Sequence, residues 1–304
     1  MLKGSIVALV TPFSAQGEIS LQSGGNENGE INEERFRFLI NWHIENKTDG
    51  VLICGTTGES ATLSHPEHKK LMEIAVDEAN KRIPIIAGCG SNSTSEALDL
   101  VGHAKKVGAD YALVITPYYN KPTQEGLYQH YKKITSSVNI PVIIYNVPSR
   151  TGSNILPETV ARVYKDCKNI VGIKEASGSL DQITELMTKV DSDFLLFSGS
   201  DEVTLPILSV GGVGVISVVA NIAPKETHNL VASFLDGNLK EAKKMQLYLY
   251  DLIKALFIET NPIPTKTALS LMGLIEFNLR LPLYKMSEDN LEKLKKILKG
   301  YKLI

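Results

Sequence analysis

The sequence contains few cysteines: Cys54, Cys89 and Cys167 are the three in 304 residues. Their number is odd and they lie far apart, so they match neither the paired framework of a small secreted protein nor the close spacing of a zinc site. This usage argues against a fold that depends on disulfides and fits a reducing compartment. We therefore expect a cytoplasmic protein.

An excess of charge is also missing. The chain has 32 lysines and arginines against 34 aspartates and glutamates, a formal net charge of −2. This balance provides no basic surface for nucleic acid and no polybasic face for a membrane. No apolar run approaches the ~20 residues of a membrane span. Residues 1–6 lack the apolar core of a secretory signal, so we expect none.

What the sequence does have is a regular alternation of short β-branched runs and amphipathic stretches. Apolar runs that alternate with helical segments are typical of a parallel sheet covered by helices. Eight such units predict an α/β fold, the (β/α)8 or TIM barrel, which takes ~250 residues. A doubly wound open sheet is the alternative, but it usually has fewer strands and a glycine-rich phosphate loop. The predicted strands begin at Ile6, Val51, Pro84, Tyr111, Val142, Ile170, Phe194 and Val213.

The chain continues well beyond the eighth predicted strand. We expect residues 1–222 to form the barrel that carries the active site, and residues 223–304 to form a C-terminal helical region packed on the barrel. One stretch interrupts the alternation: residues 17–30 are polar and glycine-rich, which predicts a surface loop after the first strand. The helices expected after the barrel span 225–235, 239–257, 266–272 and 288–298.

Lys174 stands at the end of an apolar run, in the segment Ile170-Val-Gly-Ile-Lys174-Glu. Burial disfavours the charged form of a lysine and can lower its pKa by several units. The free amine can then attack a carbonyl and form a Schiff base. Most lysines at strand ends simply reach solvent, so this position alone leaves both interpretations open.

Polar residues follow several of the other predicted strands, where a barrel places its catalytic groups. Threonine hydroxyls and tyrosine phenols in these loops can relay protons while a carbinolamine forms and loses water. Glycine-flanked backbone N–H groups can hold a small carboxylate. Arg150 can bind a carboxylate through two hydrogen bonds, or form a surface salt bridge instead. The loops are GTTGES (55–60), TPYYN (116–120), YNVPSRTG (145–152) and SGSD (198–201).

Together with GIKEASG (172–178), these motifs make the chain resemble the pyruvate-dependent class I aldolases and lyases that include N-acetylneuraminate lyase. Within that group it resembles the dihydrodipicolinate synthase family most closely, over nearly the whole chain. The resemblance implies a synthase that condenses pyruvate with L-aspartate 4-semialdehyde to 4-hydroxy-tetrahydrodipicolinate, in diaminopimelate and lysine biosynthesis. Arg150 favours this family, because the lyases that act on sugars usually lack the arginine.

The resemblance also implies roles for individual residues. Lys174 matches the imine-forming lysine, and Tyr145, Thr56 and Tyr119 match the residues of a proton relay. The residue matching Tyr119 comes from a neighbouring subunit, which implies a homotetramer built from two tight dimers. Neither a metal nor an organic cofactor is implied. The substrate-binding residues implied are Thr57, Arg150, Ile216 through its backbone, and Gly199.

A second implied site binds L-lysine as a feedback inhibitor at the tight-dimer interface. His65 and His68 belong to it, although their spacing could also indicate a metal site without a third ligand nearby, or simply a solvated helix face. Ser200 stands where an aspartate is common in the synthases, and the 17–30 loop is longer than usual. The implied effector-binding residues are Ser60, Ala61, His65, His68, Asn92, Glu96 and Tyr118.

Three alternatives to this function stay open from the sequence. An N-acetylneuraminate or 2-keto-3-deoxy sugar acid aldolase would use the same scaffold and the same Lys174. A ligand sensor without turnover would have no need of Tyr145 and Thr56 as a relay. A phosphate-binding isomerase would predict glycine-rich turns after the last two strands. Gly199 and residues 211–214 match this weakly, but neither explains Lys174.

Overall fold

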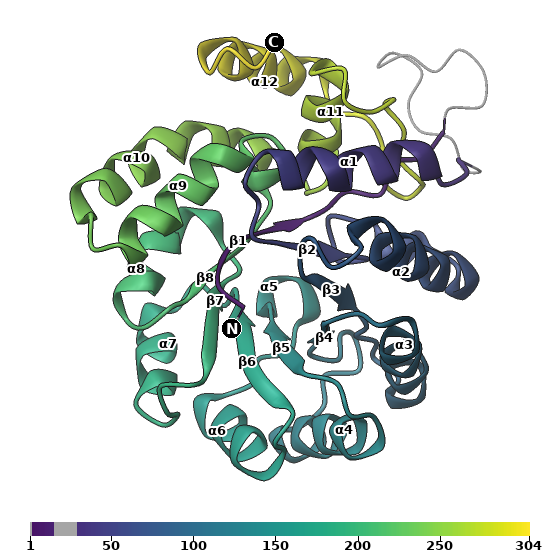
Figure 1. Cartoon of the computed structure of the whole chain (residues 1–304), viewed down its shortest axis with the longest axis vertical. Coiled ribbons are helices and arrows are strands. Elements are labelled where there is room, and N and C mark those ends of the chain that lie inside the picture. Colours follow the sequence, from purple (N-terminus) through teal and green to yellow (C-terminus); the bar gives the residue numbers. More distant parts are fainter. Residues whose placement is uncertain (1, 15–28) are drawn as a thin grey trace.

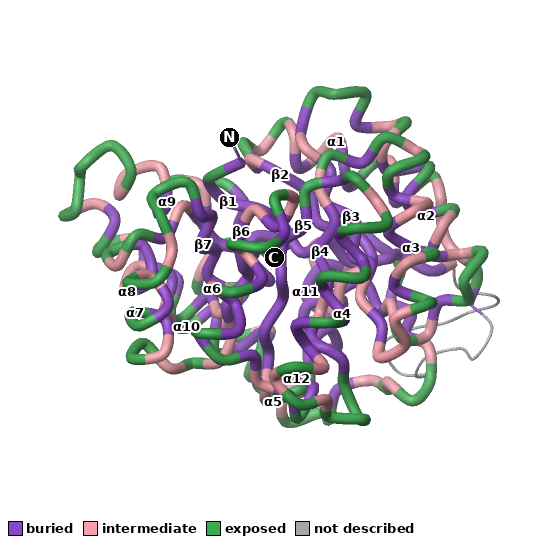
Figure 2. The backbone as a smooth tube through the Cα atoms, turned by 90° about the horizontal axis from the view of Figure 1, so that it is seen from below, coloured by how far each residue is buried: buried purple, intermediate pink, exposed green. Residues whose placement is uncertain are grey.

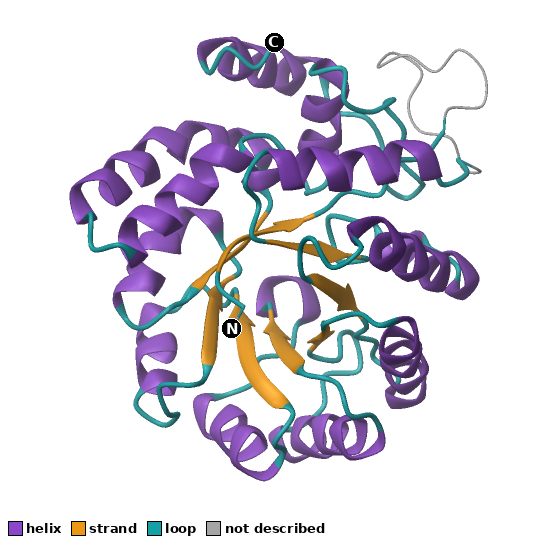
Figure 3. Ribbon diagram, viewed as in Figure 1, coloured by secondary structure: helices purple, strands orange, loops and turns teal. Residues whose placement is uncertain are grey.

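Eight parallel strands close into a barrel, as the sequence predicts (Figure 3). The computed structural model describes residues 2–14 and 29–304. Each strand pairs with its neighbours in chain order, and β1 pairs with β8 to close the sheet. All eight begin within two residues of their predicted starts. They are β1 (Gly4–Ala8), β2 (Gly50–Ile53), β3 (Ile85–Gly88), β4 (Tyr111–Ile115), β5 (Val142–Asn146), β6 (Ile170–Glu175), β7 (Leu195–Ser198) and β8 (Gly214–Ser217).

Helices alternate with the strands and form a ring around the barrel (Figure 1). Their apolar faces pack on the outward side chains of the strands and form one large buried cluster with them. The helices are α1 (Glu33–Glu45), α2 (His65–Ala79), α3 (Thr94–Val107), α4 (Gln124–Ser137), α5 (Pro148–Thr151), α6 (Pro157–Asp166), α7 (Leu180–Met187), α8 (Thr204–Ser209), α9 (Pro224–Leu235), α10 (Leu239–Leu256), α11 (Ile263–Leu271) and α12 (Glu288–Gly300).

Local sequence signals explain where these helices begin. At the start of α2 the Ser64 hydroxyl accepts the Glu67 backbone N–H, and the Glu67 carboxylate accepts the Ser64 backbone N–H at 2.8 Å. This reciprocal capping satisfies N–H groups that a helix leaves without an internal partner. It also fixes the point at which the loop after β2 ends, and that loop carries the GTTGES motif.

A second buried cluster fills the inside of the barrel. Figure 2 shows that burial concentrates in the strands, while exposed segments lie on the outer helices and loops. Because the strands are covered on both faces, they read in the sequence as continuous apolar runs. The packed interior leaves the polar side chains to gather beyond it, at the strand ends. The inner cluster includes Ile6, Leu52, Ile86, Leu113, Ile143, Phe197 and Ile216.

Four helices follow β8, close to the predicted spans. α9 packs on β1 and β8 and against α10, and α12 packs on α10 and α11. The division of the chain at residue 222 stays a prediction. Within residues 2–14 and 29–304, no helix has the length and apolar character needed to cross a membrane.

Most of the predicted surface loop at 17–30 lies outside the described residues. The two sides of its base are joined: the Ser14 N–H donates to the Glu30 carbonyl at 2.8 Å, and the Asn32 N–H donates to the Pro12 carbonyl at 2.9 Å. These bonds join the described residues on either side of the segment just before α1 begins.

Candidate active site

Lys174 ends the apolar run of β6, and its side chain is buried, with 6% exposure. In the barrel its register partners are Tyr145 of β5 and Phe197 of β7. The Lys174 Nζ lies 4.4 Å from the centroid of the Tyr145 ring. Burial lowers the pKa of Lys174 to about 8, an effect that Asp201 opposes and Arg150 reinforces. The lowered pKa raises the fraction of free amine near neutral pH, the form that attacks a carbonyl.

A cavity of about 250 Å³ lies beside Lys174 at the carboxyl ends of the strands. Apolar side chains of the barrel form part of its wall, and polar side chains from the loops form the rest. The small volume suits a substrate of few heavy atoms rather than a large ligand. Six of the predicted site residues line it: Thr56, Thr57, Tyr145, Arg150, Lys174 and Gly199.

Tyr145 and Thr56 both line the cavity, and the Thr56 side chain is close enough to the Tyr145 phenol to lower its pKa. Burial raises the pKa of Tyr145, while the nearby Arg150 and Thr56 side chains oppose that rise. The phenol therefore holds its proton at neutral pH and can donate it to a reacting group in the cavity. With the Thr56 hydroxyl as its partner, it provides two groups that can pass a proton in sequence.

Gly199 makes room for the lysine. A Cβ atom at this position would lie 2.8 Å from the Cβ of Ala176 and 3.1 Å from the Cε of Lys174. A larger residue would therefore displace either the cavity wall or the lysine stem. Ser200, the next residue, also lines the cavity.

Two predicted site residues do not line this cavity. Ile216 is buried in β8, where it packs with Tyr145 inside the barrel. Tyr119 follows β4 and is 88% exposed. Its φ of +70° is uncommon for a large side chain, and its backbone N–H donates to the Thr151 carbonyl at 3.3 Å. Within one chain, the phenol of Tyr119 therefore faces solvent.

Asp201 was not predicted as a site residue. It is buried directly after β7, and its Oδ2 accepts the backbone N–H groups of Val218 at 2.9 Å and Val219 at 3.1 Å. Among the described residues, its Oδ1 has no hydrogen-bond partner. The negative charge favours the ammonium form of Lys174. The one available signal was its place in the SGSD loop.

Asn261 was also missed. Its Nδ2 donates to the Thr57 hydroxyl at 3.0 Å, and its backbone carbonyl accepts from the Arg150 guanidinium at 3.3 Å. It therefore contacts two predicted substrate-binding residues at once. Asn261 lies 204 positions from Thr57 in the sequence, so no local pattern could have connected them.

A second, larger cavity of about 430 Å³ adjoins the first. Thr56, Arg150 and Asn261 line both cavities. Asn92 does not line the larger one; its carbonyl accepts from the Asn120 side chain at 2.9 Å. The other six predicted effector-binding residues line it: Ser60, Ala61, His65, His68, Glu96 and Tyr118.

The two histidines of this cavity have different surroundings. His65 is exposed at the start of α2, whereas His68 is buried, so the interpretation as a solvated helix face is wrong for His68. The His68 Nε2 lies 2.7 Å from the Gly88 carbonyl, and burial lowers the pKa of the ring. No group of three or more His, Cys, Asp or Glu residues in the described part of the chain is placed to hold a metal ion.

A buried lysine with a lowered pKa, beside a phenol–threonine pair at the mouth of a (β/α)8 barrel, defines a Schiff-base-forming lyase or aldolase. The model of the Dihydrodipicolinate synthetase family matches residues 1–301. The chain belongs to this family.

The relatives agree over the full length of the chain. The 4-hydroxy-tetrahydrodipicolinate synthase of Syntrophus aciditrophicus is 56% identical over 304 residues, which is 100% of both chains. The structure of dihydrodipicolinate synthase from Aquifex aeolicus has a TM-score of 0.94 and 48% identity, and the match covers 99% of this chain and 98% of that one. The lysine-bound enzyme from Cyanidioschyzon merolae has a TM-score of 0.93 and 37% identity, with 100% and 99% covered.

The lowered pKa of Lys174 predicts a cost to stability. The folded chain releases this proton at a pKa of about 8, whereas the unfolded chain holds it up to 10.5. The cost is therefore fully present below pH 8 and disappears as the pH rises through 10.5. Lys174→Met should raise the free energy of unfolding at pH 7 by up to about 3 kcal/mol, measured by urea denaturation, and the gain should vanish towards pH 10.5. Lys133→Met, at an exposed lysine of α4, is the control; an equal gain there would contradict the account.

Proposed function

We propose that this chain is a 4-hydroxy-tetrahydrodipicolinate synthase that condenses pyruvate with L-aspartate 4-semialdehyde. The observation that carries the proposal is the buried Lys174 amine, with its pKa lowered to about 8, beside Tyr145 in a small cavity. The full-length relatives that bear this enzyme's name support it. They do not favour a sugar acid aldolase on the same scaffold.

The first half of the reaction uses Lys174, Tyr145 and Thr56. The free amine of Lys174 attacks the ketone carbon of pyruvate and forms a carbinolamine. Tyr145 donates a proton to the departing hydroxyl, which leaves as water, and an imine remains; Thr56 passes protons to and from the phenol. The Tyr145 phenolate left by this donation then takes a proton from the methyl group, which gives an enamine. Its carbon is the nucleophile for the second substrate.

The second half requires the semialdehyde to be held in one orientation. Arg150 lines the cavity and presents a planar guanidinium that can pair with the semialdehyde carboxylate. The enamine carbon attacks the aldehyde and forms the new carbon–carbon bond. The amino group of the bound semialdehyde then displaces Lys174, which closes the ring and frees the amine for another turnover.

The proposed assembly is a homotetramer of two tight dimers. Tyr119 supports this, because it is 88% exposed and lines neither of the two cavities described above. In the assembly it would reach the relay of a neighbouring subunit. We place the enzyme in the cytoplasm, where its three buried, free cysteines are compatible with a reducing environment.

The larger cavity is the proposed site for L-lysine as a feedback inhibitor. Glu96 lines it and carries the charge that would pair with an α-amino group, while the Ser91 hydroxyl donates to its carboxylate at 2.6 Å. The lysine-bound structure of the enzyme from Cyanidioschyzon merolae supports this proposal. Asn92, proposed to hold the effector carboxylate, does not line the cavity within this chain.

The proposed function predicts turnover of pyruvate with L-aspartate 4-semialdehyde. This turnover is measured by coupling it to a reductase that consumes NADPH. Borohydride should trap pyruvate on Lys174, which peptide mass spectrometry would locate. Lys174→Arg should abolish trapping and turnover, because the guanidinium stays protonated. Arg150→Met should keep the trapped adduct but lower kcat/KM for the semialdehyde about 100-fold.

Each outcome of this experiment separates two parts of the proposal. Trapping without turnover would contradict L-aspartate 4-semialdehyde as the second substrate. It would indicate another pyruvate-dependent aldolase. Absence of trapping in the unaltered chain would contradict the Schiff-base mechanism. Equal loss of trapping in both variants would show that Arg150 does more than hold the semialdehyde.

The effector proposal predicts inhibition of turnover by millimolar lysine. Glu96→Gln removes the charge that pairs with the α-amino group, so the lysine concentration for half-inhibition should rise about tenfold. Each variant is compared with its own uninhibited rate. Asp99→Asn, at an exposed acid of the same helix, is the matched control. Inhibition that is absent, or weakened equally in both variants, would count against the site.

A further inference from the structure

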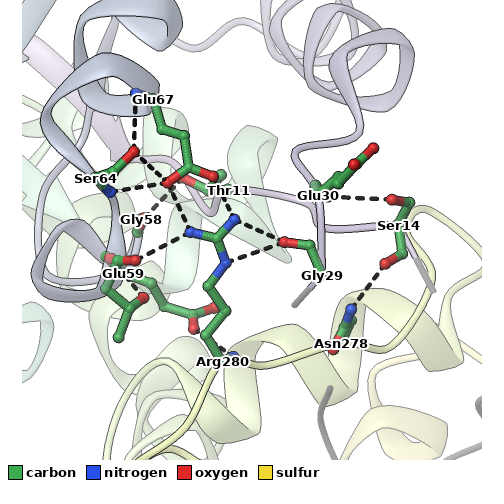
Figure 4. A network of polar contacts seen from close by, with 11 residues as sticks. Thr11, Ser14, Gly29, Glu30, Gly58, Glu59, Ser64, Glu67, Asn278 and Arg280 are labelled. Carbon is green, nitrogen blue, oxygen red and sulfur yellow. Dashed lines mark hydrogen bonds and ion pairs between the residues drawn. The ribbon is translucent and has the colours of Figure 1, made fainter. Parts of the chain in front are cut away.

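Glu59 and Lys266 form an ion pair in the interior, and neither side chain is exposed. The Lys266 Nζ lies 2.5 Å from the Glu59 Oε1. The backbone N–H of Arg280 donates to the other carboxylate oxygen at 3.2 Å (Figure 4). Lys266 also lies 4.2 Å from the centroid of the Phe13 ring. Fully buried ion pairs often contribute little net stability, because both charges lose their hydration. Stability alone therefore does not account for this pair.

Glu59 belongs to the turn that carries Thr56 and Thr57. Its φ of +53° lies in the left-handed region, which is unfavourable for residues other than glycine and persists only where the surroundings enforce it. In this conformation the Glu59 N–H donates to the Thr56 carbonyl at 3.1 Å. A rotation of the Glu59 backbone would break that bond and shift Thr56.

The ion pair fixes the side chain of this strained residue from the C-terminal region. Lys266 lies in α11, and Asn261, just before the same helix, donates to the Thr57 hydroxyl at 3.0 Å. The turn is therefore held at two separate points, at Glu59 and at Thr57. The tie at Glu59 reaches Thr56 through the bond from the Glu59 N–H to the Thr56 carbonyl, and the tie from Asn261 holds the Thr57 side chain.

We propose that Glu59 and Lys266 are positioning residues, whose buried ion pair holds the Thr56–Glu59 turn so that the Thr56 hydroxyl meets the Tyr145 phenol. This role rests on the proposed function, since the relay it serves is that of the imine chemistry. An apolar pair could pack α11 on the barrel equally well. A charged pair, by contrast, gives the Glu59 carboxylate one directed partner and so opposes rotation of the turn.

A neighbouring ion pair provides the comparison. The Arg280 guanidinium donates to the Glu67 carboxylate at 2.5 Å and to the Gly29 carbonyl at 2.7 Å (Figure 4). This pair also joins the C-terminal region to the barrel, but Glu67 lies at the start of α2, beyond the turn. Glu67→Gln keeps an oxygen that can accept the Ser64 N–H and leaves both partners of Glu59 in place. It should therefore cost stability with little effect on Thr56.

The test compares Lys266→Met and Glu59→Gln with the control Glu67→Gln in the full chain. Three quantities are measured at equal folded fraction: kcat, KM for pyruvate, and the rate at which pyruvate methyl hydrogens exchange with D2O. The exchange reports proton transfer without the second substrate. In both turn variants kcat and exchange should fall about 10- to 100-fold, with KM for pyruvate changed less than about threefold. Glu67→Gln should retain both rates.

Lys266→Met rates equal to those of Glu67→Gln would overturn the positioning role. If Lys266→Met does not fold, Glu59→Gln decides, because it keeps the shape of the side chain: unchanged rates overturn the role, and slowed exchange supports it. A parent chain on which borohydride traps no pyruvate overturns the proposed function itself. If borohydride traps pyruvate on the unaltered chain, and Lys266→Met and Glu59→Gln keep its kcat and exchange rate, only the positioning role is overturned.

Discussion

The Lys174 side chain lies with 6% exposure at the end of a barrel strand, where loss of hydration lowers its pKa to about 8. The surroundings tune this effect. Gly199 leaves space for the lysine stem, Asp201 favours the ammonium, and the positive charge of Arg150 disfavours it. The result is an amine that is more reactive near neutral pH than an exposed lysine and less stable when protonated. Function at this site is therefore obtained at the expense of folding free energy.

The C-terminal region does more than cover one side of the barrel. Asn261 joins Thr57 to Arg150, and Lys266 pairs with Glu59 behind the same turn. The groups proposed to handle pyruvate and the semialdehyde are thus tied to one segment that follows the barrel. Because Thr56, Arg150 and Asn261 also line the larger cavity, a ligand there would contact residues of the catalytic cavity directly. The proposed inhibitor would therefore act through its contacts with residues that also line the catalytic cavity.

The sequence was sufficient for the barrel and for much of the candidate site, because both depend on local patterns. Apolar runs predicted all eight strands. The motifs at strand ends, through the family resemblance, pointed to Lys174, Tyr145 and Thr56, which line one cavity. What it could not reveal were contacts made across the fold. The bonds of Asn261 and Lys266 to the GTTGES turn join residues more than 200 positions apart. Tyr119 is 88% exposed and has a φ of +70°, a backbone angle that composition does not predict.

The account is tested most directly by the rate of pyruvate imine formation as a function of pH, followed by borohydride trapping. A lysine that loses its proton at a pKa of about 8 should give a rate that rises with pH and reaches half its maximum near pH 8. A rate that keeps rising towards pH 10.5, the ordinary pKa of an exposed lysine, would contradict the claim that burial prepares Lys174 for its reaction.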